Sequence, residues 1–179
     1  RVSNLTTRQE AIGVYRIPAD EEAGSLSVDP EGLYLLLDGV QDPGNLGTIL
    51  RTCHWFGITT VFASQDTVDI YNPKTVQATM GSLGRVRVVY CDLADLIGSN
   101  PEMPVYGTLL EGEDLFHSHL DRRGFIVMGN EGNGISENIR KLINKPVTIP
   151  PYGNDHGESL NVAVATAITV AWFRGKTDN

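Results

Sequence analysis

From residue 33 onward, short apolar runs alternate with segments of helical periodicity, and this alternation constrains the fold more than any other feature. Residues 33–37 form a continuous apolar run that ends at Asp38. Such runs are typical of strands that are covered on both faces. Apolar residues at helical spacing follow between residues 46 and 56, and Gly57 ends the predicted helix.

The same alternation continues to residue 174. We predict further strands at residues 59–63, 86–90, 105–109, 125–128 and 147–149. We predict further helices at residues 75–81, 93–97, 137–143 and 160–174. Such an order is typical of a parallel sheet with helices on both faces. The sequence therefore predicts one α/β domain, with a mostly parallel sheet, over residues 31–179.

Residues 1–30 are polar and acidic and show no such alternation. We predict an extended piece at residues 12–17 followed by a loop, so that residues 1–30 form a linker or arm. The 179 residues fit one domain plus such an arm. We expect a preceding, more basic domain that this chain does not include.

The charge and the cysteines limit the possible partners. The formal net charge is −8, so the whole chain has no general attraction for nucleic acid. Cys53 and Cys91 form no ligand pair, and we expect a reducing, cytoplasmic setting. Residues 1–30 do not have the pattern of a signal peptide. The longest uncharged apolar stretch, residues 160–173, is too short to span a membrane.

Three polar segments stand at the edges of apolar ones, each after a predicted strand. They are residues 45–51, 129–134 and 159–165. Packing explains the apolar residues around them but not the polar ones. In parallel sheets, ligands bind beyond the carboxyl ends of the strands. We therefore predict that the three segments form one composite site.

The first and third segments each have two interpretations. Asn45 could cap a helix and Arg51 could be a solvated helix residue. Alternatively, Arg51 faces a phosphate or a developing oxyanion, and Asn45 orients it or the substrate hydroxyl. Ser159 could cap the last helix, but Asn161 would then lie one turn into an apolar helix and would still need a partner.

The second segment is a glycine-rich turn. Its glycines follow the order GxxGxG, which is not the GxGxxG of dinucleotide-binding loops. Glu131 would also place negative charge where a pyrophosphate must lie. The exposed backbone of such a turn can instead hold an uncharged adenine edge. The structural alternative is a tight turn with Glu131 near a helix N-terminus.

Few residues are candidates for binding RNA phosphates or a metal. The basic candidates form two pairs, each of which could equally be a solvated edge: Arg85 and Arg87, and Arg122 and Arg123. His117 and His119 share no metal-ligand spacing with another candidate, so we assign them to a surface loop and expect no metal.

Read together, the three segments resemble the SpoU family of RNA 2′-O-ribose methyltransferases, in the SPOUT superfamily. The first motif is Asn45-x-Gly47-x-x-x-Arg51, and the second runs from Met128 to Ser136. The third combines Ile149-Pro150 with residues 159–165. Each motif alone is weak, but their order and spacing extend from about residue 33 to 174. Residues 6–14 resemble the stretch that joins the family's N-terminal and catalytic domains.

The resemblance implies a fold and a cofactor that periodicity could not supply. It implies a C-terminal trefoil knot that forms a pocket for S-adenosylmethionine, and a homodimer whose site lies close to the subunit interface. Backbone at Gly129, Ile149 and Leu160 would hold the adenosine part. Other residues implied for the pocket are Thr108, Leu109, Asn130 and Gly132.

The implied reaction is methylation of a ribose 2′-hydroxyl in ribosomal or transfer RNA. Arg51 is the family's usual candidate for activating the hydroxyl. Since guanidinium has a pKa of about 12.5 or higher, electrostatic stabilisation and contact with a substrate phosphate are both open roles. Glu131 could pair with Arg51 and set its orientation, and Ser159 and Asn161 would place the ribose or shape the pocket.

One departure from the family and two rival functions follow from the same residues. The stretch before Ser159, which carries Tyr152, Asp155 and His156, is longer than is typical; this loop could contact substrate or be solvated. The alternative function is a catalytically silent RNA-binding or ribosome-assembly module. Loss of Arg51 or Asn161 would favour that function, but both residues are present. A nicotinamide-dependent oxidoreductase is disfavoured by the GxxGxG order.

Overall fold

The computed structural model describes residues 13, 14, 16, 17, 27–153 and 157–175. In these residues the strands are β1 (Leu33–Asp38), β2 (Thr60–Ala63), β3 (Arg87–Tyr90), β4 (Val105–Asp114), β5 (Gly124–Gly129) and β6 (Lys145–Thr148). The helices are α1 (Pro43–Trp55), α2 (Pro73–Ala78), α3 (Leu93–Gly98), α4 (Glu137–Arg140) and α5 (Val162–Gly175).

The strands form one sheet in the order β3-β2-β1-β5-β4-β6, and every pairing is parallel. This confirms the predicted α/β fold with a parallel sheet. Because all strands run the same way, their carboxyl ends meet at one edge. Asp38, the last residue of β1, lies opposite Gly129, the last residue of β5.

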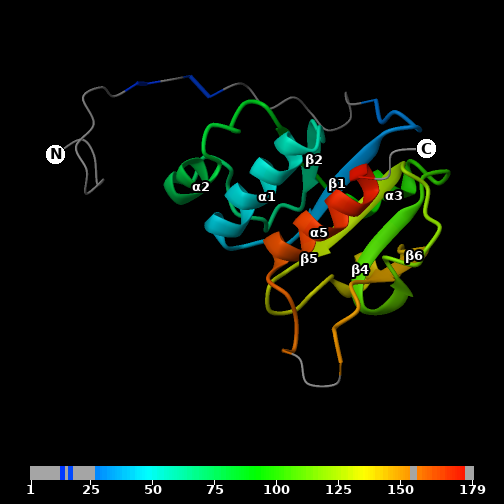
Figure 1. Ribbon diagram of the computed structural model, residues 1–179. Coiled ribbons are helices and arrows are strands. Elements are labelled where there is room, and N and C mark those ends of the chain that lie inside the picture. Colours follow the sequence, from blue (N-terminus) through cyan, green and yellow to red (C-terminus); the bar gives the residue numbers. More distant parts are fainter. Residues whose placement is uncertain (1–12, 15, 18–26, 154–156, 176–179) are drawn as a thin grey trace.

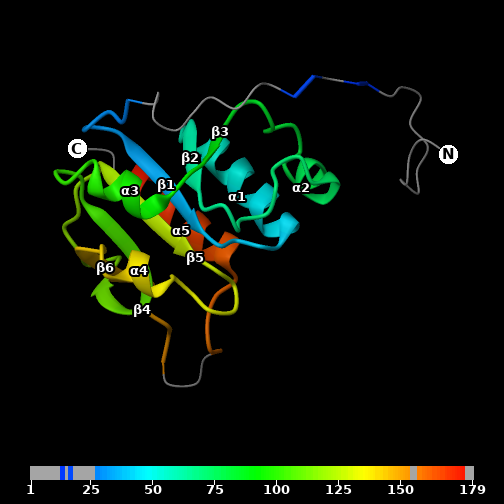
Figure 2. The ribbon, with the colours of Figure 1, turned by 180° about the vertical axis from the view of Figure 1, so that it is seen from behind.

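Helices cover both faces of the sheet. In Figure 1, α1 and α5 lie in front of the strands, with α2 beside α1. Figure 2 shows the opposite face, which is covered by α3 and α4. The contacts agree, since α1 packs against α2 and α5, and α3 packs against α4.

The apolar run of β1 is continuous because both of its faces are buried. Leu35 and Leu37 lie in the core between the sheet and the α1–α5 layer. Leu36 points to the other face, into the core beneath α3 and α4. All three side chains are fully buried. Each face of this strand therefore contributes to a separate core, as expected for a central strand of a doubly covered sheet.

Capping side chains set the starts of four helices, among them α3, which Asp92 caps, and two starts differ from the prediction. Asp42 caps α1, accepting a hydrogen bond from the backbone N–H of Asn45 at 2.8 Å. Asn72 caps α2, so this helix begins at Pro73 and not at residue 75. Asn161 accepts from the backbone N–H groups of Ala163 and Val164, so α5 begins at Val162 and not at residue 160.

The ends of α2, α4 and β4 also differ from the prediction. Helix α2 ends at Ala78 because Met80 and Gly81 adopt positive φ angles of 49° and 89°. Helix α4 ends at Arg140, since only four residues separate it from the start of β6. Strand β4 continues to Asp114, with residues 109–112 leaving the ladder between two segments that both pair with β6.

Of the extended piece predicted at residues 12–17, only residues 13, 14, 16 and 17 are described, and none of these four lies in a strand. Within the described part of the chain, no helix combines the length and the apolarity that a membrane span requires.

Candidate active site

An open cavity of about 780 Å³ lies at the carboxyl edge of the sheet. Its walls come from residues 108–111 of β4, the turn after β5, the residues that follow β6, and the first turn of α5. The volume falls within the range of about 300–1,000 Å³ that is usual for small-molecule sites.

The cavity brings together most of the residues singled out in the sequence. All seven predicted cofactor residues line it: Thr108, Leu109, Gly129, Asn130, Gly132, Ile149 and Leu160. Glu131, Ser159 and Asn161 line it as well. The second and third of the predicted segments therefore share one concave surface, whereas no residue of the first segment, 45–51, lines it. The role of each residue stays a prediction.

The glycine-rich turn is held in shape by the side chain of Asn130. Its Oδ1 accepts hydrogen bonds from the backbone N–H groups of Gly132 and Asn133, and its Nδ2 donates to the carbonyl of Gly39 at 2.7 Å. Asn130 and Gly134 also exchange two backbone hydrogen bonds. Because four N–H groups of the turn are used internally, the turn is poorly suited to cradle a pyrophosphate.

Gly129 is required by a close approach of two backbone segments. A Cβ atom built on it would lie 2.3 Å from the carbonyl carbon of Gly134 and from the nitrogen of Ile135. The added atom would therefore meet the turn itself. A side chain at this position would therefore act first on the shape of the turn.

Glu131 fixes the start of α1. Its carboxylate accepts hydrogen bonds from the backbone N–H groups of Gln41 and Asp42 and from Nδ2 of Asn45 at 3.0 Å. Desolvation raises the pKa of the Glu131 carboxyl, but the hydrogen bond from Asn45 and those from backbone N–H groups outweigh it. The pKa therefore lies below its ordinary value, and the residue is an ionised acceptor at neutral pH.

Asn45 connects Glu131 to the third motif. While its Nδ2 donates to Glu131, its Oδ1 accepts from Nδ2 of Asn161 at 3.0 Å. The partner that Asn161 needed is thus Asn45, together with the first N–H groups of α5 that Asn161 caps. Neither Asn45 nor Ser159 is the helix cap that the structural alternatives suggested, because Asp42 and Asn161 have those positions.

Arg51 lies away from this line of hydrogen bonds. No ion pair joins it to Glu131, although the structure describes both residues, so the predicted pair is wrong: Glu131 binds the start of α1 instead. Gly47, one turn earlier, faces Ala78 of α2, and His54 contacts Ser82 beyond α2. Arg51 therefore lies on the α2 side of α1, exposed and outside the cavity lining.

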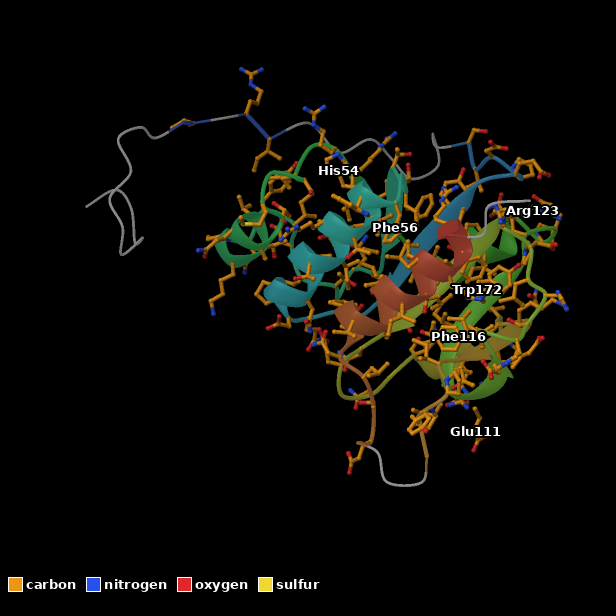
Figure 3. All side chains as sticks on the ribbon, in the orientation of Figure 1. His54, Phe56, Glu111, Phe116, Arg123 and Trp172 are labelled. Carbon is orange, nitrogen blue, oxygen red and sulfur yellow. The ribbon has the colours of Figure 1, made fainter. Side chains whose placement is uncertain are left out.

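The four arginines proposed for RNA lie at the opposite edge of the sheet from the cavity. Arg85 and Arg87 stand at the amino end of β3, and Arg122 and Arg123 stand just before β5. In Figure 3, Arg123 lies at the upper right and the cavity residue Glu111 lies well below it. Arg123 also donates to the carbonyl of Pro30. These arginines therefore lie away from the cavity, and their contact with RNA phosphates stays a prediction.

Some cavity residues had no signal that sequence reasoning could use. Glu111 comes from the irregular part of β4, and Arg140 from the end of α4, and both are exposed in the lining. In the long loop before Ser159, Tyr152 is fully exposed, whereas Asp155 and His156 lie outside the described residues. No group of metal-ligating side chains occurs among the residues searched, which are those the structure describes.

Comparisons with known proteins agree with this site. The model of the SpoU rRNA Methylase family matches residues 32–171. A 23S rRNA (guanosine(2553)-2′-O)-methyltransferase of Bacillus subtilis is 34% identical over 177 residues, which are 97% of this chain and 68% of that protein. The chain spans between 47% and 68% of the length of four curated relatives.

Solved structures are similar as well. A protein from Porphyromonas gingivalis, assigned to the TrmH family of RNA methyltransferases, is 42% identical with a TM-score of 0.86, over 98% of this chain and 70% of that one. The SpoU methyltransferase AviRb of Streptomyces viridochromogenes, solved with the cofactor AdoMet, is 26% identical with a TM-score of 0.78, over 89% of this chain and 65% of that one. As the three motifs indicated, the chain belongs to the SpoU rRNA methylase family.

Proposed function

We propose that this chain is a catalytic domain that transfers a methyl group from S-adenosylmethionine to a ribose 2′-hydroxyl of ribosomal RNA, with transfer RNA as the alternative substrate. The observation that carries the proposal is the line of hydrogen bonds from Asn161 through Asn45 to Glu131. It joins three motifs that are far apart in sequence into one site at the rim of the cavity. The names of the relatives support ribosomal RNA as the substrate class.

The cavity fits S-adenosylmethionine in size and in the character of its walls. Leu109, Ile149 and Leu160 offer apolar surface, and the chain at Gly129 and Leu160 offers backbone polar groups to an adenine edge. When bound, this cofactor supplies an electrophilic methyl group. The Thr108 hydroxyl is not free to act on it, since it donates to the carbonyl of Val127 at 3.0 Å.

The chain's own residues have two kinds of role: some hold the parts of the site in position, and others stabilise the charge that develops in the reaction. Asn45, Glu131 and Asn161 hold one another and fix α1 against the turn and α5, so we propose that they position the site. Glu131, with its lowered pKa and three N–H donors, is a weak base. The cation Arg51 would stabilise the negative charge that develops on the 2′-oxygen, and Ser159 would place the ribose.

The position of Arg51 supports a homodimer. Arg51 does not line the cavity of its own chain, so we propose that the partner subunit's Arg51 completes each site. Val164, in the first turn of α5, is about half exposed and offers apolar surface for such a contact. Light scattering should give a dimer at micromolar concentration; a monomer would overturn this arrangement.

Mixing two inactive variants tests the shared site directly. Arg51→Ala and Gly129→Val damage different parts of the site. If each site takes residues from both chains, mixed dimers contain one site with neither substitution, and activity should partly return on mixing. If Arg51 acts within its own chain, every site keeps one defect and mixing restores nothing.

Two finer predictions belong to the same proposal. We propose that the C-terminal part is threaded as a trefoil knot, which the similarity to SpoU methyltransferase structures supports. We also propose a cytoplasmic setting, supported by two unpaired, buried cysteines.

The decisive experiment follows labelled methyl groups. Intact protein, S-adenosylmethionine with a tritiated methyl group, and ribosomal RNA from a strain that lacks the gene should yield labelled RNA. Mapping should place the label on a ribose 2′-oxygen. If the RNA stays unlabelled while the protein still binds it, the chain is the catalytically silent RNA-binding module instead. Calorimetry with S-adenosylmethionine and with NAD distinguishes these two functions from that of a nicotinamide-dependent oxidoreductase, which would bind NAD.

A further inference from the structure

The charge of this acidic chain is unevenly distributed over the fold. The whole chain carries −8, but residues 43–91, from α1 to the end of β3, hold four cationic side chains against two carboxylates, a net charge of +2. The two carboxylates, Asp66 and Asp69, follow β2 at the carboxyl edge of the sheet. At the amino edge, this segment presents Arg85 and Arg87 with no carboxylate of its own.

Hydrogen bonds hold three parts of the chain together at this amino edge. Nδ1 of His54, near the end of α1, lies 3.1 Å from the Ser82 hydroxyl. The carbonyl of Ser82 accepts from the backbone N–H of Arg85 at 3.0 Å. The backbone N–H of Arg87 donates to the carbonyl of Thr59 at 2.8 Å. The end of α1, the turn after α2 and the start of β3 therefore form one surface.

Trp55 is the most unusual residue on this surface. It is the last residue of α1, directly after His54, and 84% of it is exposed to solvent. An indole ring left in water contributes little to the stability of a fold. Aromatic rings beside cationic side chains are, however, the usual composition of surfaces that bind unpaired nucleotides, because bases stack on the ring while cations contact phosphates.

We propose that Trp55, Arg85 and Arg87 form an accessory docking surface for single-stranded RNA. On this surface the two arginines contact phosphates and one unpaired base stacks on the indole. The proposal rests on the methyltransferase function proposed above and states where its RNA substrate lies beyond the cavity. RNA is the fitting occupant because this surface is cationic on a chain that is otherwise acidic.

The distance from the cavity determines what the surface does. Trp55 lies ten positions after Asn45, which is at the rim of the cavity, and this corresponds to about 15 Å along α1. In Figure 3, His54 lies toward the end of the molecule away from the cavity residue Glu111. The surface therefore contacts RNA that flanks the target nucleotide, so it contributes to affinity and not to the chemical step.

The test is filter binding of the full chain to purified ribosomal RNA, without cofactor, at several salt concentrations. Trp55→Ala should weaken binding about 5- to 150-fold, and Trp55→Phe should retain most of the affinity. The double variant Arg85→Gln/Arg87→Gln should weaken binding and lower the slope of log K against log salt by about 2, one for each phosphate contact.

Lys141→Gln is the matched control for charge. Lys141 is exposed on the opposite face, after α4, and pairs with Glu137 at 2.8 Å, so its loss removes a positive charge elsewhere. RNA affinity should change little in this variant. In the Trp55 and arginine variants, KM for RNA should rise while kcat at saturating RNA stays near the wild-type value.

Two results would overturn the proposal. The first is that every variant binds RNA with the same affinity and the same salt dependence as the wild type. The second is unchanged RNA binding together with a lower mass of Trp55→Ala in light scattering, which would make the surface a protein contact. Binding is measured without methyl transfer, so a chain that binds through this surface but does not methylate would refute only the proposed function.

Discussion

Replacing Gly129 by alanine should damage the site through the backbone. The added Cβ would lie 2.3 Å from Gly134 and Ile135 backbone atoms, whereas ordinary contacts begin at 3.4 Å. The turn must therefore move by roughly 1 Å. Since Asn130 ties this turn to Gly39, and Glu131 ties it to α1, the shift would pull on two of the three motifs.

The size of the effect follows from overpacking. Forcing an extra carbon into a filled position typically costs about 1–3 kcal/mol. For a chain of this length, each kcal/mol lowers Tm by about 2–4 °C, so Gly129→Ala should lower Tm by about 2–12 °C. If the turn must regain its shape to bind the cofactor, the same cost lowers affinity for S-adenosylmethionine by about 5- to 150-fold.

Calorimetry and thermal unfolding check this with a control in the same turn. Gly132→Ala adds the same methyl group, but its Cβ would meet only Oδ1 of Asn130 at 3.6 Å, which is ordinary contact. Its Tm should stay close to that of the wild type, and its affinity for the cofactor should fall less than that of Gly129→Ala. Wild-type Tm and cofactor affinity in Gly129→Ala would refute the packing explanation.

Three further predictions concern other residues of the site. Arg51→Ala should lower the rate of methyl transfer about 100- to 1,000-fold while cofactor affinity stays within a few-fold, and Arg51→Lys should not fully restore the rate; wild-type turnover would refute the role. Asn161→Ala should lower Tm by about 1–8 °C, because a helix cap contributes about 0.5–2 kcal/mol, whereas Asn161→Ser should retain much of the stability. Glu131 has a lowered pKa in the fold, so its stabilising effect is present above its ordinary pKa of 4.5 and is lost as pH falls through the lowered value. In denaturant titrations, the gap between wild type and Glu131→Gln should thus be steady above about pH 5 and close below it, and its size should stay under about 1 kcal/mol because the carboxylate is partly solvated; a gap that widens on acidification would contradict this.

The parallel sheet, and the placement of polar motif residues at its carboxyl edge, were predictable because both depend on local patterns. Uninterrupted apolar runs identify central strands, and parallel strands force their polar ends to one edge. Element lengths were less predictable where single residues decide them. Asn161 caps α5 with its own side chain, which moves the helix start by two residues, and the positive φ of Met80 ends α2 early.

The partners of the polar residues were beyond sequence reasoning because they depend on long-range geometry. Pairing Glu131 with Arg51 was reasonable from charge alone. In the fold, however, the backbone N–H groups at the start of α1 come within reach of Glu131, while the helix turns Arg51 toward α2. The two arginine pairs lie away from the cavity for a related reason: they stand at the amino ends of β3 and β5, and the cavity lies at the carboxyl ends of the strands.

The hydrogen bonds of the motifs separate structural roles from chemical ones. The side chains of Asn130, Glu131, Asn45 and Asn161 all have partners inside the protein, so little of their bonding capacity is left for a ligand. Substitutions there should act first on stability and cofactor affinity. Arg51 is different, because its side chain forms no hydrogen bond or ion pair with any residue that the structure describes. Because Arg51 contributes no such contact to the fold, its replacement should leave the free energy of unfolding nearly unchanged. Arg51 is therefore the position where a substitution should lower the rate of methyl transfer with the least effect on stability.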